Sequence, residues 1–204
     1  MKRQDVSRVG LGVVAGLASL VLGTQPSHSS DLPASVLVKG IQNSQAHQTA
    51  EVHNNQGVDF AQQGKLNEAI AAFNRAIQIF PKYENAHNNL GLALGSQNKF
   101  SEAVAAFNRA IEINPKNFET YNNLGIALGS QGKLAEAIAA FNRAIQLNPE
   151  DPTSRQNLGV AFWTQGKISQ AVASLQKARE LYAMQNNSEG VQQVGLILNQ
   201  ISSP

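Results

Sequence analysis

The sequence contains no cysteine in its 204 residues. Disulfide bonds, thiolate catalysis, cysteine-ligated zinc and lipidation of an N-terminal cysteine are therefore all excluded. The chain also lacks an excess of one charge outside its N-terminus, because the residues after Ser30 carry equal numbers of basic and acidic side chains. Nucleic-acid binding depends on a positive field, so we expect no nucleic acid among the partners.

No apolar run reaches the roughly 20 residues that a membrane-spanning helix needs. The closest is the run from Val9 to Gly23, which follows Lys2 and Arg3 and is followed by small polar residues up to Ser30. This order is typical of a secretory signal. We predict that residues 1–30 are a signal peptide and that the mature protein is exported, to a periplasmic, lumenal or secreted location. The alternative is a short uncleaved anchor, which would be the chain's only membrane contact.

Residue groups that carry catalysis or bind metals are also lacking. The four histidines, His28, His47, His53 and His87, have no metal-ligand spacing with acidic neighbours. Recurring charges such as Glu68, Glu102 and Glu136 indicate a solvated face, since an active site is not normally periodic. We therefore expect no enzyme activity, no cofactor and no metal.

The dominant positive feature is an internal period of 34 residues. The string Ala-Ala-Phe-Asn-Arg-Ala-Ile occurs at 71–77, 105–111 and 139–145. Other residues keep the same step: Gly57, Gly91, Gly125 and Gly159; Ala69, Ala103, Ala137 and Ala171; Pro81, Pro115 and Pro149.

Each unit predicts two antiparallel helices, because its apolar residues follow helical spacing on two segments. Gly64, Asn98, Gly132 and Gly166 stand at the turn between them, where a positive φ favours glycine or asparagine. The periodic prolines end the second helix. One hairpin cannot bury its own apolar face, so we expect neighbouring units to stack.

These residues resemble the tetratricopeptide repeat, whose pattern is an aromatic, Leu-Gly, an aromatic, Ala, Phe, Ala and Pro. The resemblance implies an all-α fold, a right-handed α-solenoid of four hairpins over residues 50–83, 84–117, 118–151 and 152–185. The chain departs from the pattern at two places in particular: Gln56 replaces the leucine and Ala183 the last proline. The first aromatic position holds His53, His87, Tyr121 and Arg155.

The flanks of the repeats are predicted separately. Residues 31–49, with Pro33, Gly40 and many Ser and Gln residues, favour a flexible linker. Residues 186–204 favour a capping helix with Ser188 as N-cap. Its apolar stripe of Val191, Val194, Leu198 and Ile201 would cover the fourth unit.

In the family, the first helix of each hairpin lines a concave groove that binds partners. The groove predicted for this chain is almost uncharged and lacks the paired lysines and arginines that family members use to bind acidic C-termini. A ladder of asparagines lines it instead, similar to the ladder that holds an extended peptide in O-linked N-acetylglucosamine transferase. The candidate binding residues are Asn55, Asn89, Asn123 and Asn157, the neighbouring Asn54, Asn88 and Asn122, and Trp163.

The asparagine ladder and Trp163 each have an alternative, purely structural interpretation. A carboxamide can donate to and accept from any peptide group, but the asparagines could equally bond within the solenoid. Trp163 could anchor a ligand or pack under the capping helix against Val191 or Val194.

We expect an interaction scaffold or adaptor whose partner is a protein or an extended peptide. The alternatives are an assembly subunit that acts through its convex face and a substrate-docking accessory to a separate enzyme.

Overall fold

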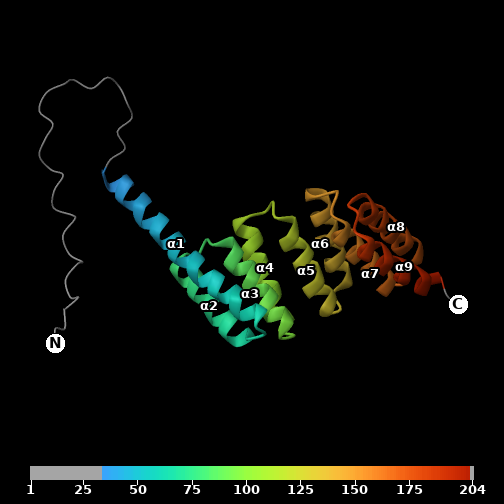
Figure 1. Cartoon of the computed structure of the whole chain (residues 1–204), viewed down its shortest axis with the longest axis horizontal. Helices are drawn as coiled ribbons and strands as arrows, with labels where there is room; N and C mark the ends of the chain where they lie inside the picture. The colour runs from blue at the N-terminus through green and yellow to red at the C-terminus, as the bar shows by residue number, and fades with distance from the viewer. Residues whose placement is uncertain (1–33, 203–204) are drawn as a thin grey trace, which may run out of the picture. The chain divides into compact units, whose positions relative to one another are not determined.

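The computed structural model describes residues 34–202, so the predicted signal segment lies outside the described part. The chain divides into two compact units between Val38 and Lys39, and every repeat lies in the second. Among residues 34–202 the regular structure is entirely helical (Figure 1), and none of these helices is both long and apolar enough to cross a bilayer. The helices are α1 Ala34–Gln62, α2 Leu66–Ile79, α3 Glu84–Ser96, α4 Phe100–Ile113, α5 Phe118–Ser130, α6 Leu134–Leu147, α7 Pro152–Thr164, α8 Ile168–Met184 and α9 Ser188–Ser202.

The first eight helices form the four predicted hairpins, which confirms the all-α solenoid. The turns between first and second helices adopt the expected left-handed backbone, with φ of 74° at Gly64 and 60° at Asn98. Gly132 and Gly166 both have φ of 76°. Each later first helix also packs on the second helix of the preceding unit, so α2 to α8 form one continuous stack.

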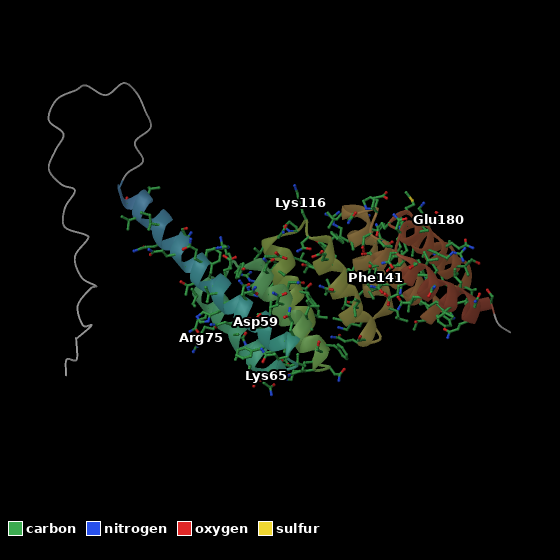
Figure 2. The ribbon with its side chains drawn as sticks, viewed as in Figure 1. Asp59, Lys65, Arg75, Lys116, Phe141 and Glu180 are labelled. Atoms are coloured by element: carbon green, nitrogen blue, oxygen red, sulfur yellow. The ribbon has the colours of Figure 1, made fainter. Side chains whose placement is uncertain are left out.

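Close helix crossing explains the periodic glycines. A Cβ atom added at Gly91 would lie 2.6 Å from the Phe107 ring, and one at Gly125 would lie 2.5 Å from the Phe141 ring. Only glycine lets these aromatic rings reach the facing backbone. Phe141 accordingly lies inside the stack, whereas Lys65 and Lys116 point to solvent at its opposite edges (Figure 2).

Polar side chains connect successive units at the ends of the helices. Glu84 accepts hydrogen bonds from Asn117 Nδ2 at 2.8 Å and Thr120 Oγ1 at 3.3 Å, one unit further along. Gln97 Nε2 donates to Asn67 Oδ1 at 2.8 Å. In the fourth unit Ala135 stands at the position of Asn67, and the Oε1 atom of the equivalent Gln165 is buried without a partner.

The N-terminal flank differs from the flexible linker expected over 31–49. Helix α1 begins at Ala34, directly after Pro33, and runs without interruption into the first repeat. No proline follows until Pro81, so nothing in the sequence forces the helix to end earlier. Its residues 39–49 are mostly exposed, but the His47 ring packs edge-on against Phe80 and Tyr83, each with centroids 5.1 Å away.

The C-terminal flank forms α9, and its N-cap is Asn187 rather than the expected Ser188. Asn187 Oδ1 accepts a hydrogen bond from the Gly190 backbone at 2.8 Å. Val194 is fully buried against Leu175, Ala178 and Tyr182 of α8.

Candidate functional site

The first helices line a groove that holds two adjoining cavities. One cavity of about 310 Å³ lies between the first and second units, with Val58, Leu66 and Phe73 on one side and Asn89 and Leu92 on the other. The next, of about 250 Å³, repeats the arrangement between the second and third units. It is lined by Gly91, Leu92, Gly95, Ser96, Phe100, Phe107, Asn123, Ile126 and Ala127.

The two cavities share residues and a common chemistry. Leu92 and Ser96 belong to the lining of both, so the cavities form one continuous track. Their walls are predominantly apolar, with one ladder asparagine, Asn89 or Asn123, in each. No charged side chain lines either cavity. Such a track suits apolar side chains of a ligand together with a neutral hydrogen-bonding group.

Gly95 keeps the second cavity open. A Cβ atom added at Gly95 would meet nothing within 4 Å, so helix packing does not require glycine at this position. Gly129 holds the same place one unit later, and a Cβ there would only touch Ala137 at 3.9 Å. Glycine costs about 1 kcal/mol inside a helix relative to alanine, which points to a role in shaping the groove rather than the core.

An exposed apolar row accompanies the cavities. Leu92 is 45% exposed, Ile126 47% and Val160 36%, one residue from each of three successive units. Large apolar side chains at this exposure, aligned by the repeat, form a contiguous surface of the kind that marks interaction sites.

The asparagines form hydrogen-bonded pairs between units, in line with the alternative that they bond within the solenoid. Asn89 Nδ2 donates to Asn54 Oδ1 at 2.9 Å. The same bond joins Asn123 to Asn88 at 3.2 Å and Asn157 to Asn122 at 3.0 Å. The acceptors Asn54 and Asn122 are only 5% and 9% exposed, which places this inner row in the wall rather than at the surface.

The outer asparagines still face the groove. Asn89, Asn123 and Asn157 are half-buried and Asn55 is exposed. In Asn89, Asn123 and Asn157 the bond to the inner row uses one N–H of the carboxamide, and the group has a second N–H and an acceptor oxygen. Asn55 Oδ1 instead accepts from Asn54 Nδ2 at 3.4 Å. The outer row can therefore hold the stack together and contact a ligand at the same time.

Two further predicted positions are placed by the structure. Trp163 is half-buried on α7, at the position that Gly95 and Gly129 hold in earlier units. At the first aromatic position, His87 Nε2 donates to the Pro81 carbonyl at 3.0 Å and Arg155 Nη2 to the Pro149 carbonyl at 3.2 Å. These two polar replacements tie α3 and α7 to the proline turn before each of them. In residues 34–202 no three His, Asp or Glu side chains are grouped so that they could hold a metal ion.

The aromatic walls of the cavities were not among the predicted site residues. They are formed by Phe73, Phe100 and Phe107. The small residues Ala61, Gly95 and Gly129 on the first helices could have indicated these walls. A small residue at this position leaves the aromatic ring of the second helix uncovered.

Solved structures of several proteins share this fold. The first TPR domain of Spaghetti (RPAP3), bound to the HSP90 peptide SRMEEVD, is 25% identical; the alignment covers 59% of this chain and 95% of that one, with a TM-score of 0.58. MamA is 22% identical over 78% of this chain and 99% of its own, with a TM-score of 0.64. Pseudomonas aeruginosa pilF is 20% identical over 79% of each chain, with a TM-score of 0.61. Comparison with curated protein sequences gives no match.

The sequence profiles of the repeat agree with the helix pairs. The TPR repeat profile matches residues 57–97, 93–132 and 127–166, and the tetratricopeptide repeat profile matches residues 152–183. Together these matches extend from α1 to α8, over more than half of the chain. The chain belongs to the tetratricopeptide repeat family.

Proposed function

We propose that this protein is an interaction scaffold that binds an extended peptide segment of a partner along the groove of its first helices. The observation that carries this proposal is the continuous track of two cavities, with apolar walls and one asparagine in each. The peptide-bound RPAP3 domain supports it, because a protein of the same fold holds a peptide.

The chemistry of the track suggests which segment would bind. Leu92 and Ile126 offer apolar contact, and the second N–H and the oxygen of the outer carboxamides at Asn89 and Asn123 can bond a peptide group of any sequence. Such a bond contributes about 0.5–1.5 kcal/mol net. We therefore expect moderate affinity and a preference for apolar side chains at two positions of the ligand.

Absence of charge separates this groove from one that binds acidic tails. The peptide held by the RPAP3 domain, SRMEEVD, has acidic residues near its end, whereas no lysine or arginine lines the cavities of this chain. Binding that does not depend on ion pairs should change little with ionic strength.

The test uses two double variants that add the same charge to opposite faces. Leu92→Asp with Ile126→Asp places two carboxylates in the groove, and Ala71→Asp with Ala105→Asp places two on exposed positions of the second helices. Crosslinking and pull-down from the organism's own extract identify partners of the unaltered chain. Circular dichroism first establishes that both variants are folded.

Loss of partners in the groove variant alone supports the proposal. Loss in the second-helix variant alone favours the assembly subunit that acts through its convex face. If both variants keep every partner, the groove is not the binding surface.

We further propose that the scaffold acts outside the cytoplasm. The support is the positive, apolar and small-residue order of residues 1–30. We expect cleavage between about Gly23 and Ser30, so N-terminal sequencing of the mature protein should give a start between about residues 24 and 31. An intact Met1 in a membrane fraction would instead favour the uncleaved anchor.

A further inference from the structure

Helix α9 has the sequence of a first helix of a fifth repeat. Asn187 caps α9 through the Gly190 backbone, as Asp151 caps α7 through Ser154. From these caps onward, Gln-Gln-Val-Gly-Leu at 192–196 stands where Gln-Asn-Leu-Gly-Val stands at 156–160. The spacing is 36 residues rather than 34, and α8 is longer than the other second helices, with 17 residues instead of 14.

The packing of α9 follows the same register. Val194 is buried on the preceding unit as Leu158 is, and the next residue is glycine in both helices. Leu196 is 66% exposed and continues the position of Val160. Without the periodic proline, α8 continues to Met184, and Asn186, with φ of 56°, then directs the chain into α9.

Gly195 of α9 faces a place that a second helix occupies in every complete repeat. A Cβ atom at Gly57, Gly91 or Gly125 would collide with the phenylalanine of the paired second helix, and one at Gly159 with Leu175. A Cβ at Gly195 would meet nothing within 4 Å. Val191 and Leu198 pack in part on the α8 cluster of Leu175, Ala178 and Tyr182, but the space in front of Gly195 is open. We call this side of α9, with Gly195 at its centre and Val191 and Leu198 at its edges, the α9 outer face.

The outer face keeps the chemistry of an interior surface. Val191 and Leu198 are only partly buried, whereas the equivalent Leu128 of α5 is 5% exposed under its second helix. Glu189 is the only charged residue in α9, so the face carries almost no charge to solvate it. Gln192, Gln193 and Gln200 are exposed and make the remaining outward side of α9 polar, so, apart from Leu196, the apolar surface is confined to the side around Gly195.

We propose that the α9 outer face binds one amphipathic helix of a partner protein, with the stripe small–x3–Phe or Leu–x2–small. The chain itself contains four precedents, because each second helix that covers a glycine carries this stripe, such as Ala137, Phe141 and Ala144 on α6. A second copy is not the expected occupant, because the second helices in the described part are already paired and residues 39–49 of α1 contain no phenylalanine or leucine.

The proposed contact is a single helix–helix interface, so we expect weak binding in fast exchange. The probe is a blocked peptide of residues 134–147, the sequence of α6. It is titrated into the isotope-labelled full chain and followed by amide chemical shifts. The expected shifts centre on Val191, Gly195 and Leu198, and the same peptide with Phe141→Asp gives none.

Matched glycine variants test the site. Gly195→Leu fills the position of the incoming ring and is expected to weaken peptide binding at least about tenfold. Gly40→Leu is the control, because a Cβ there also meets nothing within 4 Å, so both variants gain helix propensity. Leu198→Gln provides a second test if Gly195→Leu lowers the melting temperature, and it is also expected to weaken binding.

Four results would overturn the proposal. The first is binding that Gly195→Leu and Leu198→Gln both leave unchanged. The second is a set of peptide-induced shifts at Leu92 and Ile126 instead, which would make the peptide a groove ligand. The third is the absence of any peptide-induced shift. The fourth is a dimer of the free chain in sedimentation velocity that Gly195→Leu abolishes, because the occupant would then be a second copy.

Discussion

At the scale of single residues, the paired asparagines combine two roles that usually conflict. An amide inside a protein wall is costly unless it is hydrogen-bonded, and the inner asparagines meet this need by accepting from the next unit. The outer asparagines supply that bond and lie beside the cavities. Their effects on stability and on binding can therefore be separated only by comparing the two rows.

Asn54→Ala and Asn89→Ala make this comparison at one pair. Both remove the 2.9 Å bond between units, so each is expected to lower the free energy of unfolding by about 1 kcal/mol. Only Asn89→Ala also removes an amide from the cavity lining, so it should weaken peptide binding more. Urea unfolding and binding titrations measure the two quantities. Equal binding by both folded variants would show that the outer row is purely structural.

Tyr83 gives the chain a dependence on alkaline pH. Burial raises the pKa of its phenol, Glu51 and Glu84 raise it further, and the hydrogen bond with Asn85 opposes them. The folded state thus binds the proton more tightly than the unfolded state, whose pKa is near 10.0. The resulting stability is complete below that pH and is lost as the pH rises through the folded pKa.

The measurement is urea unfolding at about pH 8 and about pH 11. Tyr83→Phe keeps a ring beside His47 but has no phenol, so its stability should fall less between the two pH values than that of the unaltered chain. An identical fall in both proteins would mean that other groups cause the alkaline loss.

At the scale of helices, two kinds of glycine occur in the same element. In α5, Gly125 faces the Phe141 ring, whereas a Cβ atom at Gly129, the position of Gly95 in the preceding unit, would only touch Ala137 at 3.9 Å. The sequence pattern indicated both as parts of a repeat, but only the distances around each backbone distinguish a packing glycine from a groove glycine.

Alanine substitutions at Gly125 and Gly129 of α5 should therefore change the free energy of unfolding in opposite directions. Gly125→Ala forces a methyl group against Phe141, and overpacking of this kind costs about 1–3 kcal/mol, more than the helix-propensity gain. Gly129→Ala meets only ordinary contact with Ala137 and should gain up to about 1 kcal/mol. Chemical denaturation checks both, and destabilisation by Gly129→Ala would contradict the distinction.

The sequence predicted the repeat helices well because each prediction relied on contacts inside one hairpin. Periodic Gly, Ala, Phe and Pro residues report the crossing of two adjacent helices, and this geometry is the same in every unit. The asparagine pairs were not predicted as pairs, since they join Asn89 to Asn54 across 35 residues and depend on the rotation between units. The helical start at Ala34 was missed because exposed residues of α1 carry no periodic apolar signal.

At the scale of the whole molecule, the contribution of each terminal helix to stability should depend on how much of the apolar core it covers. In a stacked array each unit contacts only its neighbours, so an end element matters through the core that it shields. Helix α9 shields Leu175, Ala178 and Tyr182, whereas residues 39–46 are almost all exposed.

Two truncations test this difference. Removal of residues 188–204 uncovers the end of the fourth unit and is expected to lower the melting temperature and promote aggregation, because the apolar surface beneath Val194 becomes exposed. Removal of residues 1–46 keeps His47 and its ring contacts to Phe80 and Tyr83, so its effect on melting should be small. Thermal unfolding followed by circular dichroism, with light scattering for aggregation, compares the two. If the C-terminal truncation melts at the same temperature as the full chain, α9 contributes no stability to the stack.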